Sequence, residues 1–398
     1  MTTSAPPKAR LAIVVTHPIQ HFVPFYRALA AHPGIELRVL FGIPIGVKSY
    51  FDAQMQTEIL WQMDMLAGYS SEFLQELPEH RQSSFSLPNS RHLSSRLDAF
   101  APDVVLVYGY SQMNSLRAIA WGRRRNVPVM MISDSERAAR NTPLRETIKK
   151  IVIPLIYRNF AAFLSVGDNN QAYYRYYGAP AERIFRSPFT IDENAFQTAA
   201  SARNSLRKEL RAQLGIPPDA LIMLYVGKLY AGKRPTDLIT AMTRLAGAPR
   251  IHAVIAGNGE QLNELKTAAA ANTHFLGFIN VDLLPKVYAA ADALVVPSAV
   301  DRHPLVCSEA ACMGLPMIIS DRVGAVGPSD IARSGENAIV YPCGDVVALT
   351  KAMETIATDE PLRTRMSNRS RAIFETLDMK QSVRGVIDAM AAVRETRR

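Results

Sequence analysis

Cysteine is scarce in this chain of 398 residues, and its few cysteines are Cys307, Cys312 and Cys343. Their spacing matches neither a zinc site nor a disulfide framework. We therefore expect small core residues in a reducing compartment, without a disulfide. No other group of His, Cys and Asp residues has the spacing of metal ligands, so we expect neither a metal site nor a cofactor.

Long hydrophobic runs are also missing. The apolar run nearest the N-terminus covers only residues 11–15, which is shorter than a signal-peptide core or a membrane span. No later run reaches transmembrane length. We therefore expect a cytoplasmic protein.

Two patterns of nucleotide and nucleic-acid binding are absent as well. No Gly-x-Gly-x-x-Gly follows Val15, which argues against a dehydrogenase. No basic stretch is interleaved with aromatic residues, so nucleic acid is not an expected partner.

The remaining composition is that of a soluble globular protein. Hydrophobic residues make up 48% and charged residues 20%, with 21 Gly and 25 Pro, which excludes collagen-like and disordered chains. A chain of this length is expected to form two domains of about 150 to 200 residues each.

Short apolar runs, each followed by a turn and in most cases by a stretch of helical period, recur along the chain as in βα units. Continuous apolar strands between helices are typical of parallel sheets covered on both faces. The sequence therefore predicts an α/β protein with two Rossmann-like domains. We expect strands at residues 10–16, 36–41, 104–108, 128–133 and 162–166, and then at 221–226, 252–256, 274–276, 293–297, 316–320 and 338–341.

The boundary between the two domains is expected within residues 186–196, which contain Pro188 and have no clear periodicity. A charged helix follows at about residues 201–214. We assign residues 1–190 to a first domain and 200–380 to a second. A last helix, at 381–398, is grouped with the first domain, although periodicity alone does not identify its packing partner.

The most informative stretch of the second half runs from Pro297 to Pro316, after a buried strand and into a helix. Ligands of parallel sheets bind beyond the carboxyl ends of strands, where a helix N-terminus attracts phosphate. Asp301 in the loop and Glu309 in the helix can both accept hydrogen bonds from sugar or ribose hydroxyls. The structural alternative is that Asp301 caps the helix and Glu309 is solvated.

Two weaker elements also follow expected strands. The first contains Lys228 and Lys233, and a glycine precedes each lysine, Gly227 and Gly232. The two lysines can direct two positive charges at one diphosphate. The alternative is that they are ordinary surface lysines. The turn formed by Gly257, Asn258 and Gly259 follows the next strand, and by itself it indicates only a tight strand-to-helix connection.

In this order, the three elements resemble the nucleotide-binding domain of the GT-B fold family 4 glycosyltransferases, retaining enzymes that use nucleotide-diphospho-sugars. Asp301-x7-Glu309 resembles the family's Glu-x7-Glu, and Lys228-x4-Lys233 resembles its Arg-x4-Lys. The resemblance is strong over residues 220–345 and loose in the first domain. It implies a GT-B fold, with two parallel sheets facing a central cleft.

The resemblance also implies roles for individual residues. Glu309 would hold the ribose hydroxyls, Asp301 the donor sugar, and the two lysines the diphosphate. The substitution of Asp for Glu and of Lys for Arg leaves the identity of the donor sugar open. The further residues expected to bind the donor are Gly227, Gly257, Asn258, Gly259, Phe278, His303, Pro304, Leu305 and Val306.

In the first domain, His17, Gln20 and His21 follow the first expected strand and would face the cleft. The run resembles a subset of the family with His-Pro-Ile-Gln-Tyr/His. For both histidines a purely structural role stays open. Asp134 lies where the wider family often has a sugar-contacting His-Asp, which implies that Asp134 and Ser133 lie near the reacting sugar, with Gln20 and His21 on the acceptor side. Asp134-Ser-Glu136 is not interpreted as a metal-binding Asp-x-Asp, since such enzymes have one mixed sheet.

Positive charge is concentrated in the first half of the chain. Residues 1–190 carry 21 Lys and Arg against 14 Asp and Glu, a net charge of +7, and the remainder carries 24 against 22. Residues 145–158 combine basic and apolar side chains, which would suit a helix on the inner, anionic membrane face. The alternative is an ordinary helix packed on its sheet. A lipid-linked acceptor stays open.

These observations together predict a retaining, metal-independent glycosyltransferase that transfers a sugar, with a UDP-sugar favoured as donor, to a hydroxyl acceptor. A nucleotide-sugar 2-epimerase of the same fold and a non-catalytic sugar-nucleotide-binding module remain as alternatives. Asp301 and Glu309 share one loop and helix, so they are not expected to act as the two opposed carboxylates of a glycosidase.

Overall fold

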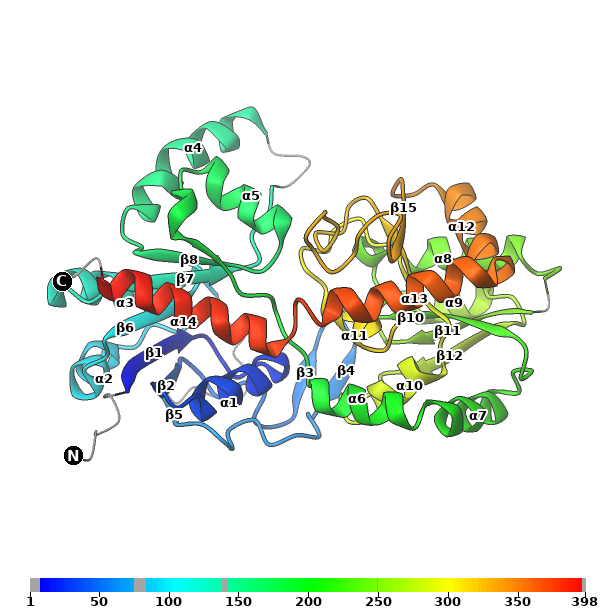
Figure 1. Cartoon of the computed structure of the whole chain (residues 1–398), viewed down its shortest axis with the longest axis horizontal. Coiled ribbons are helices and arrows are strands. Elements are labelled where there is room, and N and C mark those ends of the chain that lie inside the picture. The colour runs from blue at the N-terminus through cyan, green and yellow to red at the C-terminus, as the bar shows by residue number, and fades with distance from the viewer. Residues whose placement is uncertain (1–7, 75–83, 138–141, 249, 396–398) are drawn as a thin grey trace, which may run out of the picture. The chain divides into compact units, whose positions relative to one another are not determined.

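The computed structural model describes residues 8–74, 84–137, 142–248 and 250–395 (Figure 1). It divides into two compact units. The first contains Met1–Tyr50, Asp64–Thr190 and Met379–Arg398, and the second contains Phe51–Met63 and Ile191–Asp378. Residues 1–7 of the predicted first domain and residues 396–398 of the predicted last helix lie outside the described residues.

The first unit is built on a seven-stranded sheet with the order β5-β2-β1-β6-β7-β8-β9, and all of its pairs are parallel. The five predicted strands are confirmed. The sequence missed the two edge strands, because three residues are too few to display a period. The strands are β1 (Ala9–Val15), β2 (Ile35–Phe41), β5 (Ser71–Phe73), β6 (Val104–Tyr108), β7 (Val129–Ser133), β8 (Ala162–Ser165) and β9 (Ile184–Arg186).

Alternate residues of β1 point to opposite faces of this sheet. Leu11 and Ile13 pack with helices α1 (Val23–Ala31) and α14 (Met379–Glu395). Ala12 and Val14 contribute to the core on the other face. The helices of that face are α2 (Leu93–Phe100), α3 (Met113–Arg125), α4 (Pro143–Tyr157) and α5 (Asp168–Tyr176).

The packing partner of the last helix, which periodicity did not identify, is the first unit. Val386, Ala389, Met390 and Val393 of α14 are buried in its core. A Cβ atom added to Gly385 would lie 2.0 Å from the carbonyl oxygen of Arg186. The helix therefore approaches β9 so closely that only glycine fits at this position.

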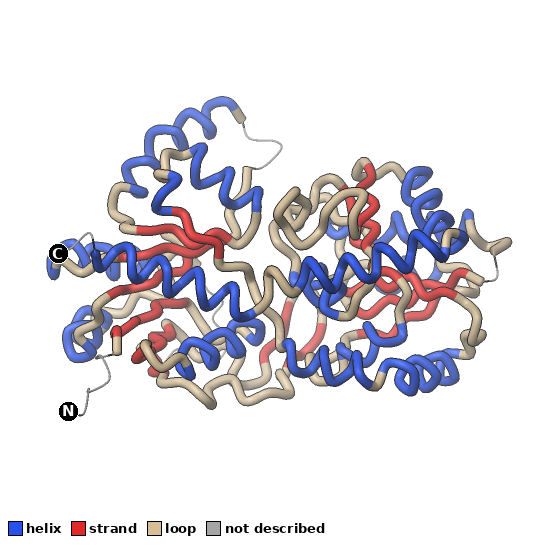
Figure 2. The backbone as a smooth tube through the Cα atoms, in the orientation of Figure 1, coloured by secondary structure: helices blue, strands red, loops and turns tan. Residues whose placement is uncertain are grey.

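The second unit has a six-stranded parallel sheet with the order β12-β11-β10-β13-β14-β15, which confirms the six strands predicted there. Helices cover both of its faces, and Figure 2 shows the alternation of strand and helix along each unit. The strands are β10 (Leu221–Val226), β11 (Ile251–Ala256), β12 (Thr273–Gly277), β13 (Ala293–Val296), β14 (Met317–Ser320) and β15 (Ala338–Tyr341).

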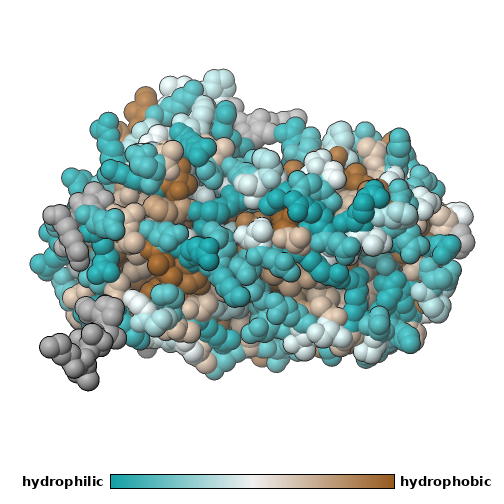
Figure 3. Space-filling view, in the orientation of Figure 1, coloured by the Kyte–Doolittle hydropathy of each residue, from teal (hydrophilic) through white to brown (hydrophobic). Residues whose placement is uncertain are grey.

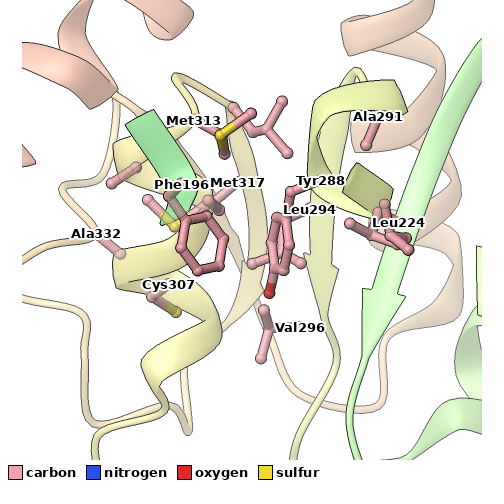
Figure 4. Packing of buried hydrophobic residues seen from close by; sticks show 14 of the residues in the cluster. Phe196, Leu224, Tyr288, Ala291, Leu294, Val296, Cys307, Met313, Met317 and Ala332 are labelled. Carbon is pink, nitrogen blue, oxygen red and sulfur yellow. The ribbon is translucent and has the colours of Figure 1, made fainter. Parts of the chain in front are cut away.

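One core of the second unit packs Phe196 and Tyr288 against Leu224 and Leu294 of the sheet (Figure 4). Its helices are α6 (Glu193–Ser201), α7 (Arg203–Leu214), α10 (Leu284–Ala290), α11 (Leu305–Cys312) and, at its C-terminal end, α13 (Glu360–Phe374). The opposite core is covered by α8 (Pro235–Arg244), α9 (Leu262–Ala268) and α12 (Val346–Thr358). The two parallel sheets, each with helices on both faces, confirm the predicted α/β fold.

The structure differs from the predicted domain assignment in one segment. Phe51–Met63 packs with the second unit, although the sequence assigned all of residues 1–190 to the first domain. This segment contains a two-stranded hairpin, β3 (Tyr50–Asp52) and β4 (Thr57–Ile59). Its contacts with the rest of the second unit join residues distant in sequence, which no local pattern indicates.

Within the described residues, no helix combines the length and the apolar character that crossing a bilayer requires.

Candidate functional site

Three loops converge at the carboxyl ends of β10, β11 and β13 in the second unit. The first two loops are joined by the N–H of Leu229, which donates to the carbonyl oxygen of Asn258 at 2.9 Å. The N–H of Ala299 donates to the carbonyl oxygen of Gly232 at 3.0 Å, which joins the third loop to the first. The lysine, glycine and aspartate motifs of the second half are therefore brought together, as parallel strands require.

Gly257 and Gly259 allow two of these loops to touch. A Cβ atom at Gly257 would lie 1.9 Å from the carbonyl oxygen of Gly227, and one at Gly259 would lie 2.4 Å from that of Leu229. Both positions therefore exclude any larger residue. These glycines set the spacing between the two loops.

Asp301 is paired with one of the predicted lysines. Its carboxylate lies 2.5 Å from Nζ of Lys233, and Oγ of Ser298 donates to it at 3.3 Å. The backbone carbonyl oxygen of Asp301 accepts the N–H of Gly324 at 2.7 Å. The alternative in which Asp301 caps the following helix is wrong, because the N-cap of α11 is Pro304 and no side chain caps it.

Lys228 is paired with a carboxylate that the sequence did not indicate. Its Nζ lies 2.9 Å from Oδ2 of Asp52 and donates to Oε1 of Gln54 at 3.0 Å. Partial burial acts to raise the pKa of Asp52, but Lys228 and the N–H groups of Met55 and Gln54 hold it below its usual value. Tyr225 fixes the lysine's loop by donating its hydroxyl to the carbonyl oxygen of Lys228 at 2.9 Å.

Glu309 lies on α11 and is not simply a solvated helix residue. The hydroxyl of Tyr288, a fully buried residue of α10, donates to Oε2 of Glu309 at 2.6 Å. Burial raises the pKa of Glu309 to about 7, an effect that the hydrogen bond from Tyr288 opposes. The carboxyl group is therefore held in place and titrates near neutral pH.

The start of α11 offers backbone N–H groups to an anion. Pro304 has no side-chain donor or acceptor with which to cap the helix, and half-buried Leu305 and Val306 form its first turn. His303, just before it, is buried, and its Nε2 lies 3.1 Å from Oδ1 of buried Asp330. His303 thus ties the helix start to a neighbouring loop, and its imidazole is already engaged by a protein group.

Phe278, one of the residues expected to bind the donor, follows β12. Its ring centroid lies 6.2 Å from that of Trp61, edge to face. The segment Phe51–Met63 therefore contacts the loop of Phe278 as well as Lys228.

In the first unit, His17, Gln20 and His21 follow β1 as predicted, and the latter two lie in a short 3-10 helix, Gln20–Phe22. Burial lowers the pKa of His17 to about 4, and burial together with His17 lowers that of His21 to about 4. Among the described residues, Nδ1 of His17 is buried without a hydrogen-bond partner. Burial therefore favours the neutral form of both imidazoles.

Ser133 ends β7, and Asp134 follows it. Oγ of Ser133 lies 3.0 Å from the hydroxyl of buried Tyr174. Because β1 and β7 both flank β6 in one parallel sheet, the histidine run and Ser133 lie at the same edge, two strands apart. The structure thus brings the predicted residues of each unit to the carboxyl edge of that unit's sheet.

The sequence did not indicate several residues that contact predicted site residues, among them Asp52, Gln54, Tyr288 and Asp330. Asp52 and Gln54 belong to a hairpin too short for a visible period. Tyr288 lies in a helix with continuous apolar neighbours, where a single hydroxyl is the only signal that a partner is required.

Comparison with known proteins supports a resemblance to group 1 glycosyltransferases. Residues 207–373, all within the second unit, match the family model for glycosyl transferases group 1. The chain is 31% identical over 184 residues to the lipopolysaccharide core biosynthesis glycosyltransferase LpsE of Rhizobium meliloti, which covers 45% of this chain and 51% of that protein. It is 25% identical over 230 residues to a D-inositol 3-phosphate glycosyltransferase of Xylanimonas cellulosilytica, covering 56% and 54%.

These alignments span about half the length of the two curated relatives. Among solved structures, HepE of Anabaena in complex with UDP matches with a TM-score of 0.70 at 15% identity, covering 96% of this chain and 100% of that one. At such identity the likeness shows the fold, and it extends over nearly the whole chain. Residues 207–373 therefore resemble a glycosyl transferases group 1 domain, and they lie within a chain that has the GT-B fold.

Proposed function

We propose that this chain is a retaining glycosyltransferase that transfers a sugar from a nucleotide-diphospho-sugar to a hydroxyl acceptor. The observation that carries the proposal is the arrangement at the start of α11, where the Lys233–Asp301 pair, the uncapped helix and Glu309 belong to one matched domain. Cations and helix N–H groups suit a diphosphate, and carboxylates suit sugar hydroxyls. A UDP-sugar is the favoured donor, because UDP is the ligand of the similar HepE structure.

The proposed reaction is a substitution on one face of the donor sugar. The anomeric carbon's bond to the diphosphate oxygen breaks as its bond to the acceptor oxygen forms, and the departing diphosphate takes the acceptor's proton. No protein nucleophile is needed. Lys228, Lys233 and the N-terminus of α11 would stabilise the charge that develops on the diphosphate.

The acceptor is proposed to be borne by a lipid or to be anionic, with α4 resting on an anionic membrane surface. Leu144, Ile148, Ile151, Val152 and Leu155 of α4 are 44% to 72% exposed. Their spacing places them on one stripe of the helix, and Figure 3 shows apolar surface over α4. Ile153 and Tyr157 pack the other side of the helix into the core. An ordinary Rossmann helix buries such a stripe on its sheet.

Basic residues accompany the stripe, since Arg145, Lys149 and Lys150 lie on the same helix. This combination of an exposed apolar stripe and positive charge fits a surface of anionic lipids. The lipopolysaccharide role in the name of the relative LpsE is compatible with a lipid-linked acceptor.

Calorimetric titration with UDP tests the donor site. Glu309→Ala is expected to weaken UDP binding at least tenfold, because a hydrogen bond to a charged group contributes roughly 1.5 to 3 kcal/mol. Glu354→Ala is the matched control, since Glu354 is an exposed glutamate on α12 of the same unit. Unchanged binding by Glu309→Ala would show that the ribose assignment is wrong.

A further inference from the structure

The segment Phe51–Met63 leaves the first unit and packs with the second. Its hairpin is closed by Asp52, whose Oδ1 accepts the N–H groups of Gln54 and Met55, both at 2.9 Å. An isolated two-stranded hairpin is marginally stable at best in water. The position of this one therefore depends on its contacts with the second unit.

These contacts fall on two loops of the proposed donor site. At one end, Asp52 and Gln54 engage Nζ of Lys228. At the other, the side chain of Asn280 donates to the carbonyl oxygen of Leu60 at 2.6 Å and accepts the N–H of Gln62 at 3.2 Å. Trp61, between Leu60 and Gln62, meets the ring of Phe278.

The ion pair at the first end is partly buried. The side chains of Lys228 and Asp52 are 32% and 16% exposed, and Oδ2 of Asp52 lies 2.9 Å from the ammonium nitrogen. Carboxylate and phosphate oxygens satisfy an ammonium group in the same way. Asp52 therefore stands where Lys228 would meet an oxygen of the donor diphosphate.

We propose that Phe51–Met63 is an autoinhibitory segment of the donor site, in which the Asp52 carboxylate competes with the donor diphosphate for Lys228. This inference rests on the proposed function. Donor binding exchanges the Asp52–Lys228 ion pair for one between Lys228 and the diphosphate, while Asn280 retains the other end of the segment. The contact lowers the affinity of the site for diphosphates and leaves its affinity for an uncharged nucleoside unchanged.

Calorimetric titration of the full chain with UDP, inorganic pyrophosphate and uridine tests the competition. The variant is Asp52→Asn, which removes the charge but keeps an oxygen that can accept the N–H groups of Gln54 and Met55, so the hairpin retains its turn. The matched control is Glu58→Gln, because Glu58 is an exposed carboxylate on β4 of the same hairpin.

Asp52→Asn is expected to bind UDP and pyrophosphate about three- to tenfold more tightly than the wild type, the effect of releasing one partly buried ion pair. Glu58→Gln should match the wild type, and uridine binding should be the same in all three proteins. Equal or weaker binding of UDP and pyrophosphate by Asp52→Asn would overturn the competition, as would an equal gain in Glu58→Gln.

The same titrations separate this inference from the proposed function. If UDP binds no more tightly than pyrophosphate, the site does not recognise a nucleotide and the proposed function fails, whereas the competition is still measured with pyrophosphate. If Asp52→Asn and wild type bind UDP equally, the competition fails and the donor site stands. Absence of binding by UDP and pyrophosphate to every protein overturns both.

Discussion

At the scale of single residues, the candidate site consists of charges that already have partners. Lys228 pairs with Asp52, Lys233 pairs with Asp301, and Glu309 accepts a hydrogen bond from Tyr288. A ligand must therefore exchange existing interactions for new ones. Only the difference in free energy between the new and the existing interactions contributes to the ligand's affinity. Such a site therefore distinguishes ligands by where their charges lie more than by the number of contacts they make.

The pKa of Glu309 gives a prediction at this scale. Because burial raises that pKa to about 7, the group is mostly neutral at pH 6 and mostly a carboxylate at pH 8. A carboxylate accepts hydroxyl hydrogen bonds more strongly than the neutral acid. The affinity for a UDP-sugar, measured by calorimetry, should therefore rise about three- to tenfold between pH 6 and pH 8.

Glu309→Gln provides the control for this pH dependence, since its amide does not titrate. A UDP-sugar is a better ligand here than UDP, whose terminal phosphate itself titrates near neutral pH. If Glu309→Gln shows the same rise in affinity as the wild type, Glu309 is not the titrating group.

At the scale of elements, α4 exposes a stripe of large apolar side chains. Its buried contacts come from Ile153 and Tyr157, while the side opposite them carries five exposed apolar residues. Burying such side chains in a lipid interface removes apolar area from water, and each Lys or Arg near an anionic surface contributes about 1 kcal/mol. Both terms favour a membrane as the partner of this helix.

Co-sedimentation with anionic and neutral vesicles measures this binding. Ile148→Gln/Ile151→Gln should reduce binding to anionic vesicles about tenfold or more without loss of folding, because the two side chains are 52% and 62% exposed. Lys149→Glu/Lys150→Glu should remove the preference for anionic vesicles, and 1 M salt, with a screening length of about 3 Å, should do the same.

The control for the apolar stripe is Val347→Gln, which changes an apolar side chain of equal exposure, 62%, on α12 of the second unit. It should bind like the wild type. Negligible and equal binding of wild type to both kinds of vesicle would refute the membrane proposal and leave a soluble acceptor.

At the scale of the whole molecule, the two units are similar in architecture and different in what the comparisons support. The family match lies within the second unit, and the first unit is related to known structures by fold. Residues 1–190, most of which belong to the first unit, carry a net charge of +7. These differences agree with the proposed roles of the two units. The second unit would hold a donor site shared with related proteins, and the first would hold an acceptor surface particular to this chain.

The charge supplied by the protein predicts that the reaction is independent of metal. In the proposed mechanism, Lys228, Lys233 and the N-terminus of α11 supply the positive charge that a divalent cation would otherwise supply to the departing diphosphate. Transfer from a UDP-sugar, followed by release of UDP, should therefore persist in excess EDTA. Complete loss of transfer, restored by added Mg²⁺ or Mn²⁺, would contradict this prediction.

The sequence by itself determined the parallel sheets and the positions of the donor-site motifs. Residues 221–226 and 293–296 are continuously apolar, and this local pattern indicates strands that are buried on both faces of a sheet. A parallel sheet then brings the loops that follow these strands to the same edge. Asp301, Lys233 and Glu309 could be placed near one another for this reason.

Only the tertiary structure decided which charges pair and which surfaces remain exposed. The partner of Lys228 lies 176 residues away in a three-residue strand, and α14 returns to the first unit after the entire second unit has been completed. The stripe on α4 has the same helical period whether it is buried or exposed, so its exposure could not be predicted. Contacts between distant residues have no local period, and their selection depends on the packing of the completed fold.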